Sequence, residues 1–489
     1  MSTEQFAITE YHNVKEVYKQ LDELIKQDIR PVDRKKMEQY LKYFEDKCSK
    51  SKEMTSKAAE FIPGGVQHNL AFNYPFPLVF TKADGAYLYD LDGNKYIDFL
   101  QAGGPTVLGS NHPVVKEKAI EIINECGPST GLFHEYELKI AEFICKHMPS
   151  VELFRMLGSG TEAVMGALRV ARLATKKKKI IKIGGAYHGW SDQMVYALRI
   201  PGTGRFEAHG IPASCSKHTQ EVKPNCIKSL EKRLKLNKLC GGTAAVILEP
   251  VGPESGTRPV DHDYNAEVRR LCTKYGALLI FDEVVTAFRI GMSGAQGYYG
   301  IEPDLTVFGK VVAGGYPSAG GIGGKKEYMA YLAAGLQGAK KKAMVGGTMA
   351  ANPLSSVAGY YTLKEIEANN ACNKAGQAGD RLTKGLQQLI EKYKLPFVAY
   401  NQGSICHLET SATMFVPVNI KKPWTIPQSL KQIKKRKHMM EEMGAAYMAE
   451  GLVTLAGSRM YTSMADTDEV IDDALARFER VFKNIERVN

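Results

Sequence analysis

The sequence predicts an α/β protein that has a large domain, with a mostly parallel sheet flanked by helices, and a smaller α+β domain built from both chain ends. Short apolar runs near residues 156, 179, 244, 277 and 305 read as buried strands. Longer helical patterns separate several of these runs, and such alternation predicts a parallel sheet covered on both faces. With 489 residues, of which 44% are hydrophobic, the chain is long enough for two or three domains.

The first 60 residues predict a helical extension. Apolar residues recur at helical spacing between residues 12 and 60, which indicates two or three amphipathic helices. We expect these helices to pack against the main body or a partner subunit. Residues 61–150 are assigned to the N-terminal part of the small domain and a connecting segment. Within them, Asp92-Gly93-Asn94 lies between alternating strands, which is a hairpin signal.

Residues 151–353 are expected to form the large α/β domain and residues 354–489 the C-terminal part of the small domain. The chain closes with the helical pattern "TDEVIDDALARFERVFKNI", for which Thr467 or Asp466 is the predicted N-cap.

The charge and cysteine content exclude several classes of protein. The net charge is +11, but the basic runs at residues 176–179, 340–342 and 434–437 are short and scattered, and no nucleic-acid-binding motif accompanies them. They predict solvated surface, with attraction of anionic substrates as a weaker alternative. Nine cysteines without a C-x-x-C pair indicate neither a disulfide framework nor a zinc site. With no signal peptide or apolar span in the sequence, we expect a soluble cytoplasmic protein without membrane partners.

A small-residue loop precedes the first long helix of the large domain. A strand-like run ends before Gly158, and Ser159, Gly160 and Thr161 then lead into the helix. Free backbone N–H groups and the positive end of a helix dipole favour an anion at such a position. Taken alone, the motif fits a tight turn with a serine cap equally well.

Two further motifs follow strands. Asp282 comes after four apolar residues, at the carboxyl end of a strand, where α/β sheets bind ligands. Tyr187 and His188 follow another strand and could face a flat ligand. Taken singly, the aspartate fits a cap or an ion pair, and the Tyr-His pair fits ordinary packing.

Lys310 is the residue that, combined with these motifs, indicates one particular type of ligand. It ends an apolar run and is followed by glycines, although a lysine without a partner is costly to bury. An anion cradle, a stacking ring, a carboxylate and an amine at strand ends together fit pyridoxal 5'-phosphate. The cradle would take the phosphate, the carboxylate would keep the pyridine nitrogen protonated, and the amine would form a Schiff base. The glycines after Lys310 would leave room for cofactor and substrate.

The chain resembles class III pyridoxal-phosphate aminotransferases of fold type I, and within them the subgroup of glutamate-1-semialdehyde 2,1-aminomutase and β-amino-acid aminotransferases. The resemblance runs from about Gly64 to the C-terminus. It rests on "GSGTEA", "YHGW", "LEPV", "IFDEVVTAFR", "PDLTVFGK" and "GGTMAANP", which occur in that order.

The resemblance implies a role for each matched position. Lys310 would be the Schiff-base lysine and proton carrier, Asp282 the partner of the pyridine nitrogen, and Tyr187 and Val284 the covers of the two ring faces. Ser159, Gly160 and Thr161 would hold the phosphate, with His188 and Glu254 near the cofactor. Thr348 would reach the phosphate of a neighbouring subunit, which implies a homodimer with shared active sites.

The sequence departs from both relatives at the expected substrate pocket. The aminomutase carries an arginine shortly after "PGGV", and the β-amino-acid enzymes carry one where this chain has His68; neither arginine is present. His68, Asn69, Phe72 and Tyr74 are therefore candidates for a different pocket, or for a loop packed on the dimer partner. Arg199, Arg205 and Arg289 could each bind an acid group, and the sequence does not choose among them.

Three functions remain open. The leading one is amino-group transfer between an amine or amino acid, including a β- or ω-amino acid, and an oxo acid or aldehyde. The second is an intramolecular aminomutase or an epimerase with the same lysine. The third is a non-catalytic structural dimer, which the joint presence of Lys310 and Asp282 disfavours. A dinucleotide-binding oxidoreductase is disfavoured because no suitable G-x-G-x-x-G motif is present.

Overall fold

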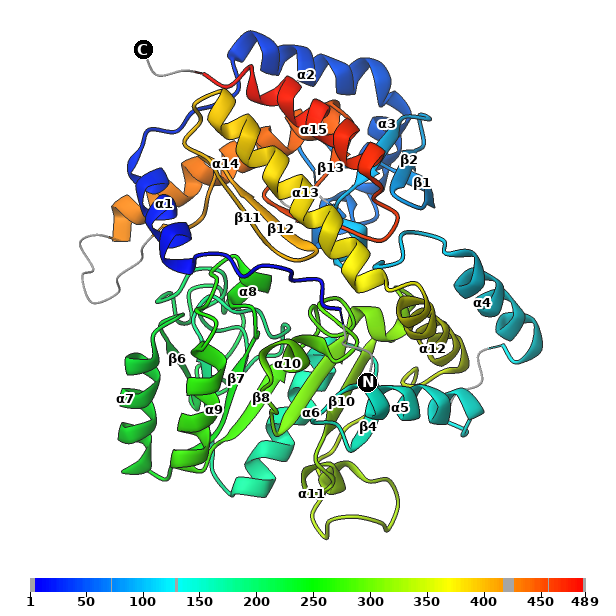
Figure 1. The fold of residues 1–489 in the computed structure, drawn as a ribbon, viewed down its shortest axis with the longest axis vertical. Coiled ribbons are helices and arrows are strands. Elements are labelled where there is room, and N and C mark those ends of the chain that lie inside the picture. The colour runs from blue at the N-terminus through cyan, green and yellow to red at the C-terminus, as the bar shows by residue number, and fades with distance from the viewer. Residues whose placement is uncertain (1–4, 72, 128–130, 417–425, 456, 487–489) are drawn as a thin grey trace.

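The computed structural model describes residues 5–71, 73–127, 131–416, 426–455 and 457–486. Two parts lie one above the other in Figure 1. The lower part holds a seven-stranded sheet, and the upper part gathers helices from the N-terminal and C-terminal regions of the chain.

The large sheet has the order β4-β10-β9-β8-β7-β5-β6. Its strands are β4 (Leu153–Leu157), β5 (Lys179–Ile183), β6 (Thr219–Val222), β7 (Thr243–Leu248), β8 (Leu278–Asp282), β9 (Leu305–Gly309) and β10 (Gly320–Gly324). All are parallel except β10, which runs antiparallel to both neighbours. The α/β class with a mostly parallel sheet is confirmed. Strands β6 and β10 were not predicted, and some of the glycines after Lys310, expected to leave room for ligands, form β10.

Alternate residues of the buried strands face opposite layers, as a period of two requires. Ile180, Ala245 and Ile280 pack with α6 (Gly160–Thr175) on one face. Ile181, Val246 and Phe281 pack with α7 (Ile227–Lys238) and α9 (Tyr264–Tyr275) on the other. Both faces are therefore covered, which leaves the strand ends for ligands.

Further helices complete the lower part. They are α4 (Pro113–Glu125), α5 (Glu135–His147), α8 (Pro253–Gly256), α10 (Gly294–Tyr299), α11 (Lys326–Met329) and α12 (Pro353–Ala368). A short 3-10 turn, η4 (Lys310–Ala313), follows β9 directly and packs with α12.

The upper part contains two small sheets. One pairs β1 (Phe80–Asp84), β2 (Tyr87–Asp90), β3 (Lys95–Asp98) and β13 (Leu452–Val453). The other pairs β11 (Val398–Gln402), β12 (Ile405–Glu409) and β14 (Arg459–Tyr461). Strands β2 and β3 are antiparallel around Asp92-Gly93-Asn94, which confirms the predicted hairpin.

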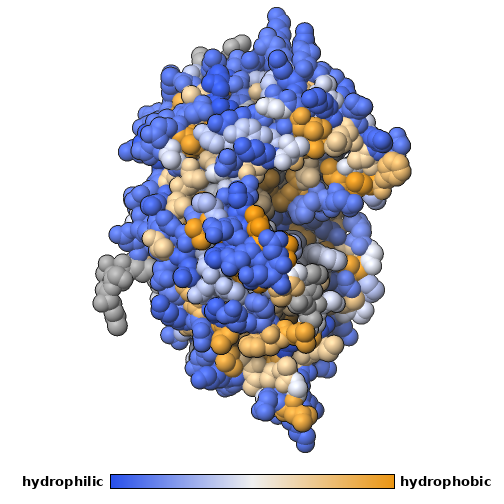
Figure 2. Space-filling model, turned by 90° about the vertical axis from the view of Figure 1, so that its right-hand side faces the viewer, coloured by the Kyte–Doolittle hydropathy of each residue, from blue (hydrophilic) through white to orange (hydrophobic). Residues whose placement is uncertain are grey.

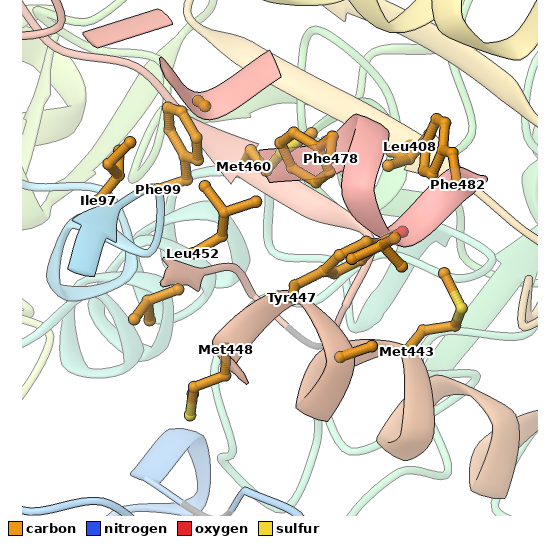
Figure 3. Close-up of a cluster of buried hydrophobic side chains, with 14 of the residues drawn as sticks. Ile97, Phe99, Leu408, Met443, Tyr447, Met448, Leu452, Met460, Phe478 and Phe482 are labelled. Atoms are coloured by element: carbon orange, nitrogen blue, oxygen red, sulfur yellow. The ribbon is translucent and has the colours of Figure 1, made fainter. Parts of the chain in front are cut away.

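Helices from the two chain ends cover these sheets. They are α1 (Val14–Lys26), α2 (Arg34–Lys47), α3 (Ser49–Ala58), α13 (Ala371–Lys392), α14 (Ile426–Ala449) and α15 (Asp468–Phe482), the last capped at Thr467 as predicted. Phe44 of α2 belongs to the same apolar cluster as Tyr447 of α14 and Phe478 of α15. Figure 3 shows part of this cluster, in which Tyr447 and Phe478 approach each other from two helices, with ring centroids 5.1 Å apart. The exact domain boundaries stay a prediction.

Within the part of the chain that the structure describes, no helix is both long and apolar enough to cross a lipid bilayer.

Candidate active site

A cavity of about 1140 Å³ lies at the carboxyl ends of the central strands and is lined by residues of both parts of the molecule. One face of the molecule is visibly hollowed at mid-height (Figure 2). The cavity brings together most of the predicted site residues, namely His68, Asn69, Ser159, Gly160, Thr161, Tyr187, His188, Glu254, Asp282, Val284 and Lys310.

Lys310 follows the last residue of β9 in a left-handed backbone conformation, with φ of 50°. Its amine donates a hydrogen bond to the carbonyl oxygen of Gly103. No carboxylate of the described residues forms an ion pair with it. Burial lowers the pKa of the Lys310 amine, although the nearby Tyr461 opposes this shift. Burial therefore favours the neutral form of this amine.

Asp282 ends β8 and is fixed by two contacts. Its Oδ2 lies 2.7 Å from Nδ1 of His188, and its Oδ1 accepts the N–H of Val284 at 3.1 Å. The His188 side chain is fully buried, and its burial lowers the pKa while Asp282 opposes that shift. An ionised carboxylate can only accept, so His188 Nδ1 carries the proton here. The hydrogen bond from His188 thus fixes the orientation of the Asp282 carboxylate.

Ser159 caps α6: its hydroxyl accepts the N–H of Glu162 at 3.2 Å. The N–H groups of Gly160 and Thr161 lie in the first turn, where a helix offers no intrahelical acceptor. These amides face the cavity with the positive end of a 16-residue helix. The geometry suits a bound phosphate group.

Val284 fixes the floor of the cavity. A methyl group added at Gly160 or at Gly309 would lie 2.8 Å from a Val284 side-chain carbon, so both glycines are needed for close packing. Tyr187 also lines the cavity, with 49% of its surface exposed. An aliphatic and an aromatic side chain are thus available to cover a flat ligand.

The sequence did not reveal Glu249, which anchors this region. Its carboxylate accepts backbone N–H groups of Tyr187, Glu254 and Ser255 at 3.2, 2.9 and 2.6 Å. Burial raises the pKa of Glu249 to about 8, and the charge of Asp282 raises it as well, against these three donors. Glu254 itself lies nearer the opening, with its carboxylate 3.9 Å from Arg199.

Arg459 and Tyr461 of β14 also line the cavity and were not predicted. Arg459 donates to the carbonyl of Glu254 at 2.6 Å, while its buried Nε has no partner among the described residues. Burial raises the pKa of Tyr461, but the charges of Arg459 and Lys310 outweigh this and lower it. Strand β14 is far from Lys310 in the sequence, so no local motif around Lys310 could identify these two residues.

The structure chooses among the three candidate arginines. Arg289, one of the three candidates, is fully buried and donates to Gly104, Gln101, Ser404 and Thr462. These acceptors occupy the N–H donors of Arg289, which therefore has a structural role. Arg205 bonds Ile211, Pro212 and Ser216 and does not line the cavity.

Arg199 alone of the three faces the cavity, near the rim. His68 and Asn69 line it too, and Tyr74 does not. Phe72 lies outside the described residues. Thr348 is exposed and lines a second cavity, of about 770 Å³, away from Lys310 of the same chain.

Comparison with known proteins identifies the family to which this chain belongs. Residues 70–482 match the family described as aminotransferase class-III. The chain is 39% identical over 363 residues to glutamate-1-semialdehyde 2,1-aminomutase 2 of Lachnoclostridium phytofermentans, which covers 73% of this chain and 83% of that relative. This chain belongs to the class III aminotransferases.

Solved structures of similar fold agree. A glutamate-1-semialdehyde aminomutase from Pseudomonas aeruginosa PAO1 has a TM-score of 0.79 at 21% identity, covering 96% of this chain and 99% of that one. A β-phenylalanine aminotransferase from Variovorax paradoxus has a TM-score of 0.78 at 24% identity, covering 93% and 99%. The fold is therefore that of the fold type I pyridoxal-phosphate transferases.

A class III aminotransferase depends on pyridoxal phosphate, and the residues present fit that cofactor. The amides at the start of α6 suit its phosphate, Asp282 is oriented by His188 so that it could accept from the ring nitrogen, and the Lys310 amine has no ion-pair partner in the described part of the chain. The two glycines against Val284 keep that floor flat.

Proposed function

We propose that this class III aminotransferase moves an amino group from an amine or amino acid to an oxo acid or aldehyde, with Lys310 as the residue that holds the cofactor covalently. The observation that carries the proposal is the buried Lys310 amine, which lies in the cavity with Asp282 and has a pKa lowered by burial. A neutral amine is needed both as a nucleophile and as a base.

When bound, pyridoxal phosphate supplies an aldehyde that captures amines and a ring that delocalises the electron pair left at the substrate carbon. The chain's own residues do the rest. Asp282, oriented by His188, would hold a proton on the ring nitrogen. Lys310 would remove a proton from the substrate carbon and return one, because its amine is the base at the strand end. Tyr187 and Val284 would exclude water from the two ring faces.

Arg459 supports a carboxylate-bearing substrate. Its guanidinium lines the cavity, its Nε is buried without a partner among the described residues, and its positive charge acts on the Lys310 pKa. The unpartnered Nε of this arginine favours a nearby anionic group as its hydrogen-bond acceptor.

The enzyme is proposed to act as a homodimer. Exposed apolar side chains, including Phe133 and Leu138, surround the second cavity, which Thr348 lines. A second copy of the chain would cover this apolar surface, and Thr348 would then reach the partner's site. All nine cysteines are free thiols, which suits a reducing cytoplasmic compartment.

An intramolecular aminomutase is the second candidate, because the 39% identical relative is named as one. The two reactions differ in whether a separate oxo product leaves. The test incubates the holoenzyme with a panel of amino donors and one oxo acid and assays both products. A new oxo compound and a new amino acid in equal amounts support amino transfer. Recovery of only an isomerised amine supports the aminomutase.

A further inference from the structure

The wall of the active-site cavity carries two buried charged side chains that the proposed chemistry does not use. Arg258 follows α8, Glu409 ends β12, and both line the cavity that also contains Lys310. They are 8% and 4% exposed. Buried charges normally pair with each other or with hydrogen-bonding groups. A buried charge that lacks such a partner therefore indicates a place for a ligand.

Arg258 has no hydrogen bond or ion pair with any residue that the structure describes. Its guanidinium instead lies over the ring of Phe415, 4.2 Å from the centroid. Tyr18 packs edge-on to the same ring at 5.5 Å, and its buried hydroxyl also lacks a partner within the described chain. A guanidinium has five N–H donors, and here they are left for an occupant of the cavity.

Glu409 carries the opposite charge to Arg258, but the two side chains are not bonded to each other. Burial raises the pKa of the Glu409 carboxyl, whereas the hydrogen bond from the Thr413 hydroxyl and the charges of Arg258 and Arg459 oppose this shift and favour the anion. Even so, no nitrogen of either arginine lies within 4.0 Å of a Glu409 oxygen, the limit for an ion pair. The wall therefore offers a separate cation and a separate anion to the same cavity.

Other charged side chains also line the cavity. Arg459 donates to the Glu254 carbonyl, the Glu254 carboxylate lies 3.9 Å from Arg199 at the rim, and Lys437 is exposed. Arg258 and Glu409 differ from these, because both are buried and neither forms an ion pair with any residue that the structure describes. A dicarboxylate at this position would be repelled by Glu409, and a simple diamine would be repelled by Arg258. A group that carries one carboxylate and one ammonium matches both.

We propose that Arg258 and Glu409 bind the α-carboxylate and α-ammonium of an α,ω-diamino acid, whose ω-amine is thereby presented to Lys310. This inference rests on the proposed amino transfer and names its donor class. The ω-carbon would be oxidised from amine to aldehyde while the acceptor's oxo carbon is reduced to an amine. The C–N bond lost by the donor is regained by the acceptor, so no external oxidant is required.

The test compares three donors with the holoenzyme that share the same chain from Cα to the ω-amine: L-lysine, 6-aminohexanoate, which lacks the α-amine, and cadaverine, which lacks the α-carboxylate. We expect kcat/KM for L-lysine to exceed that for either analogue by about 10- to 100-fold, the range for losing one charge-assisted hydrogen bond. L-Ornithine and its analogues repeat the comparison for a shorter chain.

Variants assign each contact. Arg258→Gln should remove the advantage of L-lysine over cadaverine, and Glu409→Gln its advantage over 6-aminohexanoate. Arg270→Gln, which loses only a surface pair with Glu267, is the matched control and should change neither ratio. Calorimetric binding of L-lysine to the Lys310→Ala protein gives a readout without turnover, and both wall variants should weaken that binding by a similar factor. Thermal unfolding checks that each variant is folded.

The outcomes separate the two proposals. If amines are transferred but L-lysine has no advantage, or if both wall variants leave the ratios unchanged, the diamino-acid site is wrong and amino transfer stands. Preference for an amino dicarboxylate that Arg258→Gln abolishes would also overturn the role of Glu409. If no amine in the panel yields an oxo product, the proposed function itself fails.

Discussion

Lys310 combines two costs that a structural residue would avoid. Its partly buried amine has no ion-pair partner among the described residues, and its backbone is left-handed. Non-glycine residues with positive φ cost free energy and gather at functional sites. The sequence predicted the lysine and Asp282 because both end apolar strands in recognisable motifs. Arg258, Glu409 and Arg459 were not predicted, because they come from loops and sheet edges that only the folded chain brings to the cavity.

Lys310→Ala should lower kcat by at least about 100- to 10,000-fold, the range for removing a general acid–base group. Cofactor should still bind, because the α6 amides and Asp282 remain, but the visible band of lysine-bound cofactor should disappear. Steady-state kinetics and absorption spectra check this. Lys326→Ala, on the exposed end of α11, is the control. Turnover near the wild-type rate in Lys310→Ala would refute the assignment.

Glu249 should make stability depend on pH. Its pKa is raised from an ordinary value near 4.5 to about 8, so between these values the folded protein keeps a proton that the unfolded chain has lost. The free energy of unfolding should therefore fall as pH rises through this window, by up to about 1.4 kcal/mol per pH unit from this group.

Glu249→Gln should flatten this pH dependence, although the variant loses one good acceptor and is less stable at low pH. Urea unfolding at several pH values between 5 and 8 measures the difference from the wild type. The exposed Glu53→Gln should leave the slope as it is. An unchanged slope in Glu249→Gln would show that this carboxyl does not hold the proton.

At the scale of elements, the strands with continuous apolar runs were predictable and β10 was not. Its sequence, Gly-Gly-Ile-Gly-Gly, has a single apolar, β-branched residue among four glycines, which is too few to identify a strand. The reason lies in its neighbours: a methyl group at Gly320 would lie 2.3 Å from the Ser159 carbonyl oxygen. Glycine is needed there because the backbone of Ser159, at the start of α6, approaches closely, and no local pattern reveals this contact.

Gly320→Ala should therefore destabilise the protein by about 1–3 kcal/mol, the usual cost of overpacking. It should also weaken cofactor binding, because Ser159 must move. Chemical denaturation and cofactor titration measure the two effects. Gly444→Ala, in α14 with nothing within 4 Å of the added methyl, is the control and should be neutral or stabilising. Equal behaviour of the two variants would remove this explanation of β10.

At the scale of the whole molecule, the exposed apolar surface around the second cavity predicts self-association. Phe133, 77% exposed, is its largest side chain. Phe133→Asp should weaken the dimer by about 30-fold or more, the effect of losing an interface anchor, and activity should fall with it. Sedimentation at several concentrations gives the dissociation constant. Leu239→Asp, 82% exposed after α7, should not change it, and a monomeric wild type would contradict the prediction.

One apolar core contains residues from both the N-terminal and the C-terminal region, and this limits when the protein can complete its folding. Phe44 and Phe482 belong to one apolar cluster, yet a ribosome adds 5–20 residues per second. The first helices must therefore wait roughly 20 to 90 s for α15 to be made. During that interval the apolar face of α2 lacks its α15 partner, while the central sheet can already assemble. The nascent chain thus presents a binding opportunity for chaperones that the finished enzyme conceals.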